Sequence, residues 1–344
     1  MCITYSDSTA VMTPTSLLPA SLFSRFRVLA GVEIEDTDMY GRYHQQRQML
    51  KSSSEQMSDL SEGWGGTANA IQTDTDNNEP IPAGGERRVL CHFYSSFFNQ
   101  PKKIILIAIP GLVVELELGN DTDCFEEPTA RYSIIRPTFL CSVLSLQADV
   151  VNSFSRHLIG GHSISYNLPA TVFHMKAQVT SAAFSLPITR GFARLSTIMF
   201  SFVGPTGKVV TDFVHPQNGA APTGNDPFKY YLAYGSNRTP VFSVDGVAEQ
   251  YMRTRMALAI LERSDGDHLN ITPKDYRTNR GIFALNLEKA QGEDPDVGHS
   301  GVSTRGGAQI TLELQGAPVG STVYVCAFHD AICQLGPSGV VLMD

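Results

Sequence analysis

Apolar and polar residues alternate with a period of two over several stretches of the chain, as in strands with one buried face. Val114, Leu116 and Leu118 share one face of such a strand. Glu115 and Glu117 share the other face, so we expect them at the surface rather than in acid–base chemistry. The same reasoning predicts a hairpin over residues 22–35 and strands over residues 88–98, 103–109, 112–119, 132–151, 165–188, 192–204, 281–290, 308–316, 321–332 and 339–343.

Other segments carry the period of a helix. Residues 38–51 begin with an acidic residue, end with a basic one and place apolar side chains near one face, which predicts a short surface helix. A second helix is predicted over residues 247–263, and a helical turn that ends in glycine over residues 153–161. Polar segments rich in Gly, Pro, Ser or Asn predict long loops over residues 52–86, 205–240 and 264–280.

The two halves of the chain repeat one order of elements, namely a hairpin, a helix and late strands. The matched pieces are Phe23–Phe26 with Phe192–Leu195, Tyr43 and Arg47 with Tyr251 and Arg255, and Leu116–Gly119 with Leu312–Gly316. Two copies of one all-β unit with loop insertions explain this pattern. Chance is the competing explanation, because short apolar–charged matches are common in strand-rich chains. Units of this size suit eight-stranded sandwiches and jelly rolls.

Composition supports a folded, strand-rich protein. Of the 344 residues, 42% are hydrophobic and only 17% are charged, while 29 glycines and 19 prolines favour many turns. The net charge of −8 argues against a broad basic face that binds nucleic acid. The N-terminal segment lacks the basic start of a signal peptide, and the longest apolar run, residues 104–114, is too short to span a membrane. We therefore expect no membrane span.

The cysteines give no sign of metal chemistry. They are irregularly spaced and form neither a CxxC pair nor a cluster with histidine. Because several lie in apolar runs, we expect buried free thiols in a reducing compartment. The six are Cys2, Cys91, Cys124, Cys141, Cys326 and Cys333.

Short motifs that suggest catalysis or ligand binding fail on inspection. Residues 204–209 (GPTGKV) lack the first glycine and the final Ser or Thr of a phosphate-binding loop. Ser300 lies in GHSGV, which has Val302 where a hydrolase elbow needs glycine. The run that starts at Asp74 lacks both the turning glycine and the final glutamate of a calcium loop. We therefore expect no catalytic, cofactor-binding or metal-binding residues and no cofactor.

Two longer runs carry a resemblance to a known family. SLFSRFRVLAGVEIEDTDMYGRYHQQRQML (residues 21–50) and HFYSSFFNQPKKIILIAIPGLVVELELG (residues 92–119) resemble the first barrel of a double jelly-roll major capsid protein. The closing segment from GIFALNLEKAQG to VYVCAFHDAI (residues 281–332) is similar to the last strands of the second barrel. Within the tailless icosahedral DNA virus lineage, the chain looks like the capsid proteins of Polinton-like viruses or their integrated copies.

The resemblance implies an all-β fold of two consecutive jelly rolls, each an eight-stranded β-sandwich, with short helices and long loops between strands. The first would span residues 1–124 and the second residues 125–344. The first jelly roll is expected to be incomplete at its N-terminus, because the family has one or two strands before the position of Leu17.

The same resemblance implies a structural virion protein without enzymatic activity. Three copies would form a pseudo-hexagonal block, blocks would tile an icosahedral capsid, and the long loops would form outer towers. The implied partners are further copies of this chain, penton proteins and minor capsid proteins, with no direct sequence-specific nucleic-acid binding. The protein would be made in the host cytoplasm and would reside in the virion.

A different class of function stays open at this point, namely a carbohydrate-binding or glycan-processing protein built from two sandwiches. Such sites present exposed aromatic side chains beside carboxylates. Trp64 lies in a glycine-rich segment (EGWGG) and is compatible with this alternative, but it is equally compatible with a loop anchor.

Overall fold

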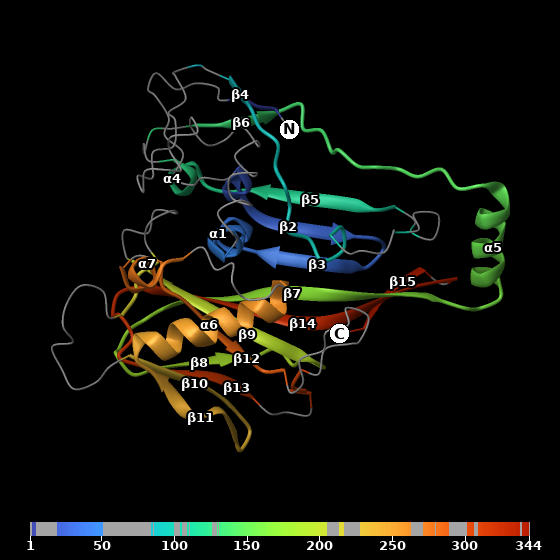
Figure 1. Cartoon of the computed structure of the whole chain (residues 1–344). Coiled ribbons are helices and arrows are strands. Elements are labelled where there is room, and N and C mark those ends of the chain that lie inside the picture. The colour runs from blue at the N-terminus through green and yellow to red at the C-terminus, as the bar shows by residue number, and fades with distance from the viewer. Residues whose placement is uncertain are drawn as a thin grey trace.

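The second half of the chain folds into a sandwich of two antiparallel sheets (Figure 1). In the computed structural model one sheet has the order β11-β10-β13-β8, and the other has the order β12-β9-β14-β7, with β15 pairing to the end of β14. The strands are β7 Ile164–Gln178, β8 Phe184–Ile188, β9 Leu195–Val203, β10 Lys229–Tyr234, β11 Asn237–Asp245, β12 Ile282–Asn286, β13 Ile310–Gln315, β14 Thr322–Gly336 and β15 Gly339–Met343.

The structure describes only part of the chain. The described residues are 2–4, 19–50, 84, 86–99, 104, 109, 111–125, 129, 131–204, 213–216, 228–262, 271–278, 280–288, 301–305, 309–337 and 339–343. Most of the predicted loop over 52–86 and of the predicted strand over 103–109 lies outside them.

The strands of the second half follow the jelly-roll winding. Strands β7 to β14 are eight in number and pass repeatedly between the two sheets, so that each sheet receives four of them. Strand β9 lies inside its sheet, and all of its residues are buried. Phe200 on β9 stacks on Phe283 of β12 at 5.2 Å and packs edge-on against Tyr230 of β10 at 5.1 Å. These rings fill the space between the two sheets.

The first half contains two smaller sheets of three described strands each. Their orders are β3-β2-β5 and β4-β1-β6, and all the pairings are antiparallel. A short 3₁₀ helix, η1, leads into β2. The elements are β1 Cys2–Thr4, η1 Pro19–Leu22, β2 Phe23–Leu29, β3 Glu33–Asp38, β4 Glu86–Arg88, β5 Val113–Leu118 and β6 Ser133–Ile135.

The strand orders of the two halves match. The order β3-β2-β5 repeats β11-β10-β13, and β4-β1-β6 repeats β12-β9-β14. A helix follows the hairpin in each half, α1 (Tyr40–Leu50) in the first and α6 (Val247–Glu262) in the second. The predicted repeat of an all-β jelly-roll unit is therefore confirmed. The described part of the first half has no strand in the places that β7 and β8 occupy in the second.

One of the three sequence matches behind the repeat is wrong. Phe23–Phe26 begins β2, whose place in the strand order is that of β10. Phe192–Leu195 instead leads into β9, which is not the first strand of a hairpin. Both segments put an aromatic ring and an arginine before an apolar strand, which is too common a pattern to identify equivalent strands. The matches between the helices and between β5 and β13 are confirmed by their positions.

Four predicted segments differ from the structure, and one of them is the predicted loop over 264–280, in which residues 273–278 form helix α7. Residues 88–98 contain strand only at Arg88, and the aromatic residues after it form irregular chain and a turn. Residues 132–151 form only β6 and the start of α5. The predicted loop over 205–240 contains β10 and the first half of β11. The remaining described helices are α4 Asp121–Cys124, α5 Ala148–Ile159 and α7 Pro273–Thr278.

Candidate functional site

Helix α1 joins the two sandwiches. Its Gln46 Nε2 donates a 2.5 Å hydrogen bond to Ser201 Oγ on β9, and Tyr43 OH lies 3.3 Å from Thr171 Oγ1 on β7. The ring of Tyr43 also packs against Phe328 of β14, with 6.5 Å between ring centroids. A helix of the first sandwich therefore packs on the β12-β9-β14-β7 sheet of the second. The contact is head-to-tail, because the helix of one unit meets the sheet of the other.

Helix α6 holds the corresponding place in the second half but leaves one face uncovered. On its inner side, Thr254 Oγ1 donates a 3.1 Å hydrogen bond to the carbonyl oxygen of Ile282 on β12. On its outer side, Met252 and Met256 are 51% and 53% exposed. Exposed methionines on one helix face are a common feature of protein-binding surfaces.

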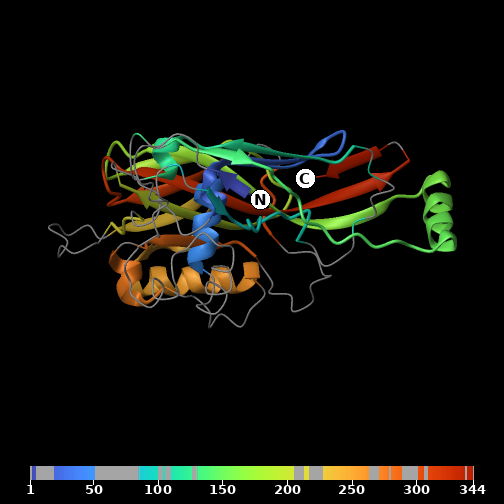
Figure 2. The ribbon, with the colours of Figure 1, turned by 90° about the horizontal axis from the view of Figure 1, so that it is seen from above.

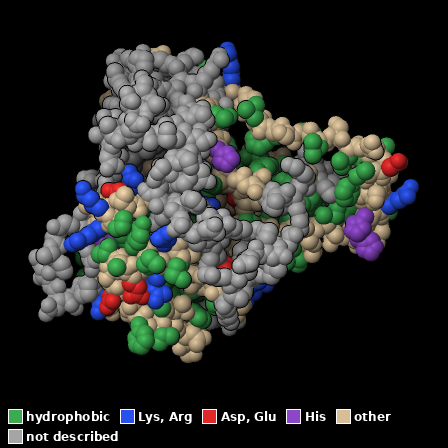
Figure 3. All heavy atoms as spheres, in the orientation of Figure 1, with side chains coloured by type: hydrophobic (Ala, Val, Ile, Leu, Met, Phe, Trp, Pro, Cys, Tyr) green, Lys and Arg blue, Asp and Glu red, His purple; other side chains and the backbone are tan. Residues whose placement is uncertain are grey.

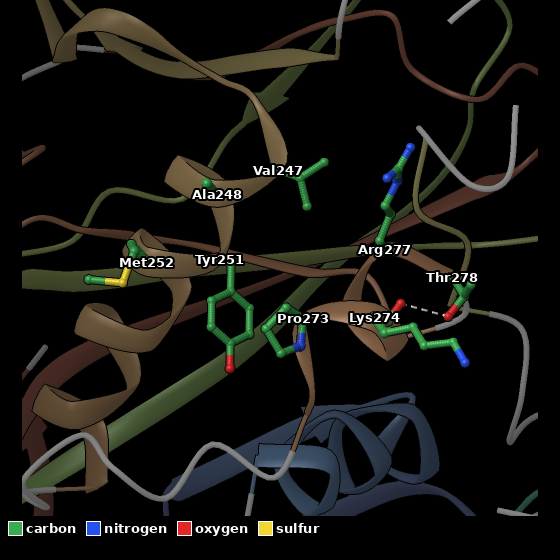
Figure 4. A pocket seen from close by; sticks show the side chains of 8 residues that line it. All are labelled: Val247, Ala248, Tyr251, Met252, Pro273, Lys274, Arg277 and Thr278. Carbon is green, nitrogen blue, oxygen red and sulfur yellow. Dashed lines mark hydrogen bonds between the residues drawn. The ribbon is translucent and has the colours of Figure 1, made fainter. Parts of the chain in front are cut away.

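A shallow hollow of about 800 Å³ lies between α6 and α7 (Figure 4). Val247, Tyr251 and Pro273 supply apolar walls, and Lys274 and Arg277 lie at its border. The lining contains no carboxylate, histidine or cysteine. Such a surface can accept an apolar side chain of another protein.

An extended segment and helix α5 project from the body of the molecule (Figures 1 and 2). Residues 136–147 pair with no strand and are all exposed, and α5 has no buried residue. Apolar side chains gather along this part of the surface (Figure 3). The large ones in the extended segment are 49–71% exposed, namely Phe139, Leu140, Val143, Leu144 and Leu146. Contiguous apolar exposure of this kind marks an interaction site.

Glu35 is a buried carboxylate with a structural role. Its oxygens accept hydrogen bonds from Ser95 Oγ at 2.6 Å, the Ser96 amide at 3.1 Å and the Phe97 amide at 3.5 Å. Burial raises the pKa of Glu35 above its ordinary value, and these hydrogen bonds oppose that shift. Glu35 fixes the turn after residue 94 to β3.

His215 is a second buried ionisable group. Its Nε2 lies 3.2 Å from Gln250 Oε1 of α6, and its ring packs against Tyr276 and Phe283. Burial lowers the pKa of His215 to about 4, and the contact with Gln250 opposes that shift. The imidazole is therefore neutral at pH 7 and is part of the contact between α6, α7 and β12.

The expected burial of the cysteines is correct for three of the five whose side chains the structure describes. Cys124, Cys326 and Cys333 are buried, and burial raises the pKa of Cys333 to about 11. Cys91 is half-buried. The expectation is wrong for Cys141, which is exposed because its apolar segment is not paired into a sheet.

The other residues that the sequence analysis considered as candidate sites form no common cluster among the described residues. Glu115 forms an ion pair with Arg27 across the β2–β5 pairing, so it lies on the polar face as predicted. Trp64, Asp74 and Ser300 lie outside the described residues. Among the described residues no group of His, Cys, Asp and Glu is arranged to hold a metal ion, and no helix has the length and apolarity to cross a membrane.

Sequence reasoning missed the exposed faces of residues 136–147 and α6. It treated the first as paired strand and gave no separate role to the second. A usable signal existed for residues 138–146, where no residue is charged and both strand faces are apolar. That composition is typical of a strand with neighbours on both sides. Only the arrangement in space shows that these neighbours are missing from the described chain.

Comparison by sequence identifies no relative, since no family model matches the chain and no curated protein is similar to it. Comparison by structure does find similar proteins. The fold is the all-β fold of the double jelly-roll capsid proteins, with two sandwiches in one chain.

The chain is similar to VP54 of PBCV-1, solved by crystallography and fitted into a reconstruction of the virophage Sputnik. The TM-score is 0.57 at 10% identity, over 100% of this chain and 87% of that chain. It is similar to the PBCV-1 virus capsid, with a TM-score of 0.53 at 10% identity over 100% and 87% of the two chains. A protein in the Sputnik virophage structure gives a TM-score of 0.54 at 10% identity, over 99% and 80%. At such identities the likeness establishes the fold alone.

Proposed function

We propose that this protein is a major capsid protein, a structural virion component that forms pseudo-hexameric homotrimers and tiles an icosahedral shell without enzymatic activity. The observation that carries the proposal is the likeness over the full chain to solved viral capsid structures. The repeated sandwich supports it independently, because two similar units in one chain let three chains present six similar units.

The contact inside the chain supports the trimer. Helix α1 rests on the sheet of the second sandwich through Tyr43 and Gln46. The counterpart of α1 is α6, and the counterpart of that sheet is β4-β1-β6. If α6 of one copy packs on β4-β1-β6 of the next, the same head-to-tail contact is repeated between chains, and such contacts form closed rings when the rotation allows. The exposed Met252 and Met256 would then be covered.

The finer features of the proposal follow the resemblance in sequence. The lineage would be that of Polinton-like viruses or their integrated copies, with penton and minor capsid proteins as partners. The protein would be made in the host cytoplasm and reside in the virion, and the two jelly rolls would divide at residues 124 and 125. Strand β6 follows that division along the chain, but its pairing with β1 makes it part of the β4-β1-β6 sheet of the first half.

Electron microscopy of the purified protein tests the capsid role directly. We expect class averages with a hexagonal outline and three-fold symmetry, because six sandwiches would lie around one axis. Trimers without a hexagonal outline, or compact monomers only, would contradict the proposal.

A further inference from the structure

An arm of the protein, residues 136–162, leaves the body of the molecule and returns to it at β7 (Figures 1 and 2). The arm consists of the extended residues 136–147, helix α5 and a short turn. Every residue of the extended part is exposed, and no residue of α5 is buried. A helix of 12 residues is only marginally stable in water and usually gains its stability from the packing of one face. Helix α5 therefore lacks most of the packing that stabilises helices of its length.

Helix α5 has one apolar side and one polar side. At 3.6 residues per turn, four apolar side chains share one side of the helix, namely Val150, Val151, Phe154 and Leu158. The opposite side carries the polar residues, namely Asp149, Asn152, Ser153, Arg156 and His157. Leu158 is half-buried and packs against the core, whereas Val150 is 41% exposed. The apolar side is therefore anchored at its C-terminal end and partly open along its length.

The extended part of the arm carries apolar residues at both odd and even positions. Alternate residues of an extended chain face opposite sides, so Phe139 and Val143 face one side, and Leu140 and Leu144 face the other. A flat protein surface would cover only one of these two sides. The acyl chains of a lipid bilayer are fluid and surround inserted side chains on every side. The backbone of this segment still needs water, so the chain itself would lie at the level of the headgroups.

The charge of the arm is opposite to that of the whole chain. The chain carries a net charge of −8, but the arm has two arginines and two histidines and a single carboxylate, Asp149. Arg156 and His157 lie in the last turn of α5, and the His157 ring stacks on His162 at 4.8 Å. Basic and histidine side chains are visible at the outer end of the molecule (Figure 3). Basic residues beside an apolar surface are complementary to a bilayer with anionic headgroups.

The same charges disfavour a second copy of this chain as the partner of the arm. Two arms packed on each other would bring two surfaces of the same net charge together. The apolar hollow between α6 and α7 is bordered by Lys274 and Arg277, which would repel the basic end of an arm from another copy. An anionic lipid surface meets both requirements of the arm, namely apolar cover and negative charge.

We propose that residues 136–162 form a membrane-binding arm whose partner is the surface of a bilayer that contains anionic phospholipids. Helix α5 would lie flat in the headgroup region with Val150 and Phe154 towards the acyl chains, and Leu140 and Leu144 would insert beside it. The 12 residues of α5 span roughly 18 Å, which is less than the roughly 30 Å of a hydrocarbon core. The arm would therefore lie on the membrane without crossing it. This inference goes beyond the proposed capsid function and does not depend on it.

Flotation of the full-length protein with lipid vesicles tests the inference. Vesicles of phosphatidylcholine and phosphatidylglycerol are compared with vesicles of phosphatidylcholine alone. We expect saturable binding that is at least about threefold tighter on the anionic vesicles. A polarity-sensitive fluorophore on the exposed Cys141 is expected to shift its emission to shorter wavelength, with Cys141→Ser as the labelling control. Hydrogen exchange in α5 is expected to slow by at least about tenfold when vesicles are added.

Paired variants separate insertion of the arm from general adhesion. Leu140→Ser with Leu144→Ser changes two side chains that are 71% and 65% exposed, so the free protein keeps its melting temperature. We expect at least about tenfold weaker binding to both kinds of vesicle. Val241→Ser with Val319→Ser is the matched control, since these side chains are 74% and 63% exposed elsewhere, and it leaves binding unchanged. Arg156→Gln is expected to weaken binding to the anionic vesicles alone, by about threefold.

Three results would overturn the inference. The first is the absence of binding to anionic vesicles at millimolar lipid. The second is an equal loss of binding in the leucine pair and in its valine control, which would indicate general adhesion. The third is slow exchange of α5 without vesicles, since another part of the chain would then cover the arm, or a second copy if the effect depends on protein concentration. None of these results bears on whether the protein forms three-fold particles.

Discussion

At the scale of single residues, burial depends on partners far along the chain. The donors around Glu35 are the Ser95 hydroxyl and the backbone amides of Ser96 and Phe97, and Gln250 lies against His215. The alternation of residues predicts that β3 is a strand, but it contains no information on which distant turn will cover Glu35. Local sequence therefore predicts the strand and leaves the buried carboxyl group unpredicted.

His215 gives the fold a measurable dependence on pH. Its pKa falls from about 6.5 in the unfolded chain to about 4 in the folded protein, so the unfolded state binds the proton more tightly. The stability due to neutral His215 is present above pH 6.5 and is lost as the pH falls towards 4. We expect the loss at pH 5 to be about 2 kcal/mol relative to pH 7.5.

Urea unfolding of the wild type and of His215→Gln at both pH values measures this effect. The variant cannot take up that proton, so its free energy of unfolding is expected to fall less on acidification, by about the same 2 kcal/mol. Other groups titrate in both proteins and cancel in the comparison. Equal losses in the two proteins would show that His215 is accessible to protons in the folded state.

At the scale of elements, the sequence predicts strands well where apolar residues alternate or run together between turns. Strand β13 and helix α6 fall where their periods predict them. Strand β10 was missed because Pro, Gly and Asn precede it, although Tyr230 and Leu232 alternate within it and are fully buried. The strand prediction is wrong for residues 136–147 for another reason. Strand-like residues form a strand only when a neighbouring strand is available to pair.

The close packing of α1 against residues 21–23 depends on Gly41. A Cβ atom at this position would lie 2.9 Å from Ser21 O and 3.3 Å from Phe23 O, both backbone atoms. We expect Gly41→Ala to destabilise the protein by about 1–3 kcal/mol, because the clash outweighs a gain in helix propensity of about 1 kcal/mol. Denaturant unfolding measures this, and Ser153→Ala on the exposed face of α5 serves as the control. A more stable Gly41→Ala protein would show that α1 has room to move.

At the scale of the whole molecule, the sequence predicted two all-β units and the structure confirms their jelly-roll winding. The resemblance also led to the expectation that the first unit is incomplete at its N-terminus, and this stays a prediction. The surfaces available for assembly were beyond sequence reasoning, because they depend on which faces of α6 and of residues 136–147 remain uncovered after folding.

The proposed ring contact predicts the effect of charges on α6. Met252→Lys with Met256→Lys changes two half-exposed residues, so the monomer is expected to keep its fold and its melting temperature within a few degrees. Association between copies is expected to weaken by at least about tenfold, because two charges would be buried in the contact without partners. Sedimentation velocity over a range of concentrations checks this, with Val319→Lys as the control. Unchanged association would exclude this face of α6 from the contact.

The most direct test of the capsid account is the solution mass of the purified protein, measured by light scattering coupled to size exclusion. The account predicts a species of three times the chain mass of 37.5 kDa. A stable species of one chain mass at all concentrations would contradict the trimeric block.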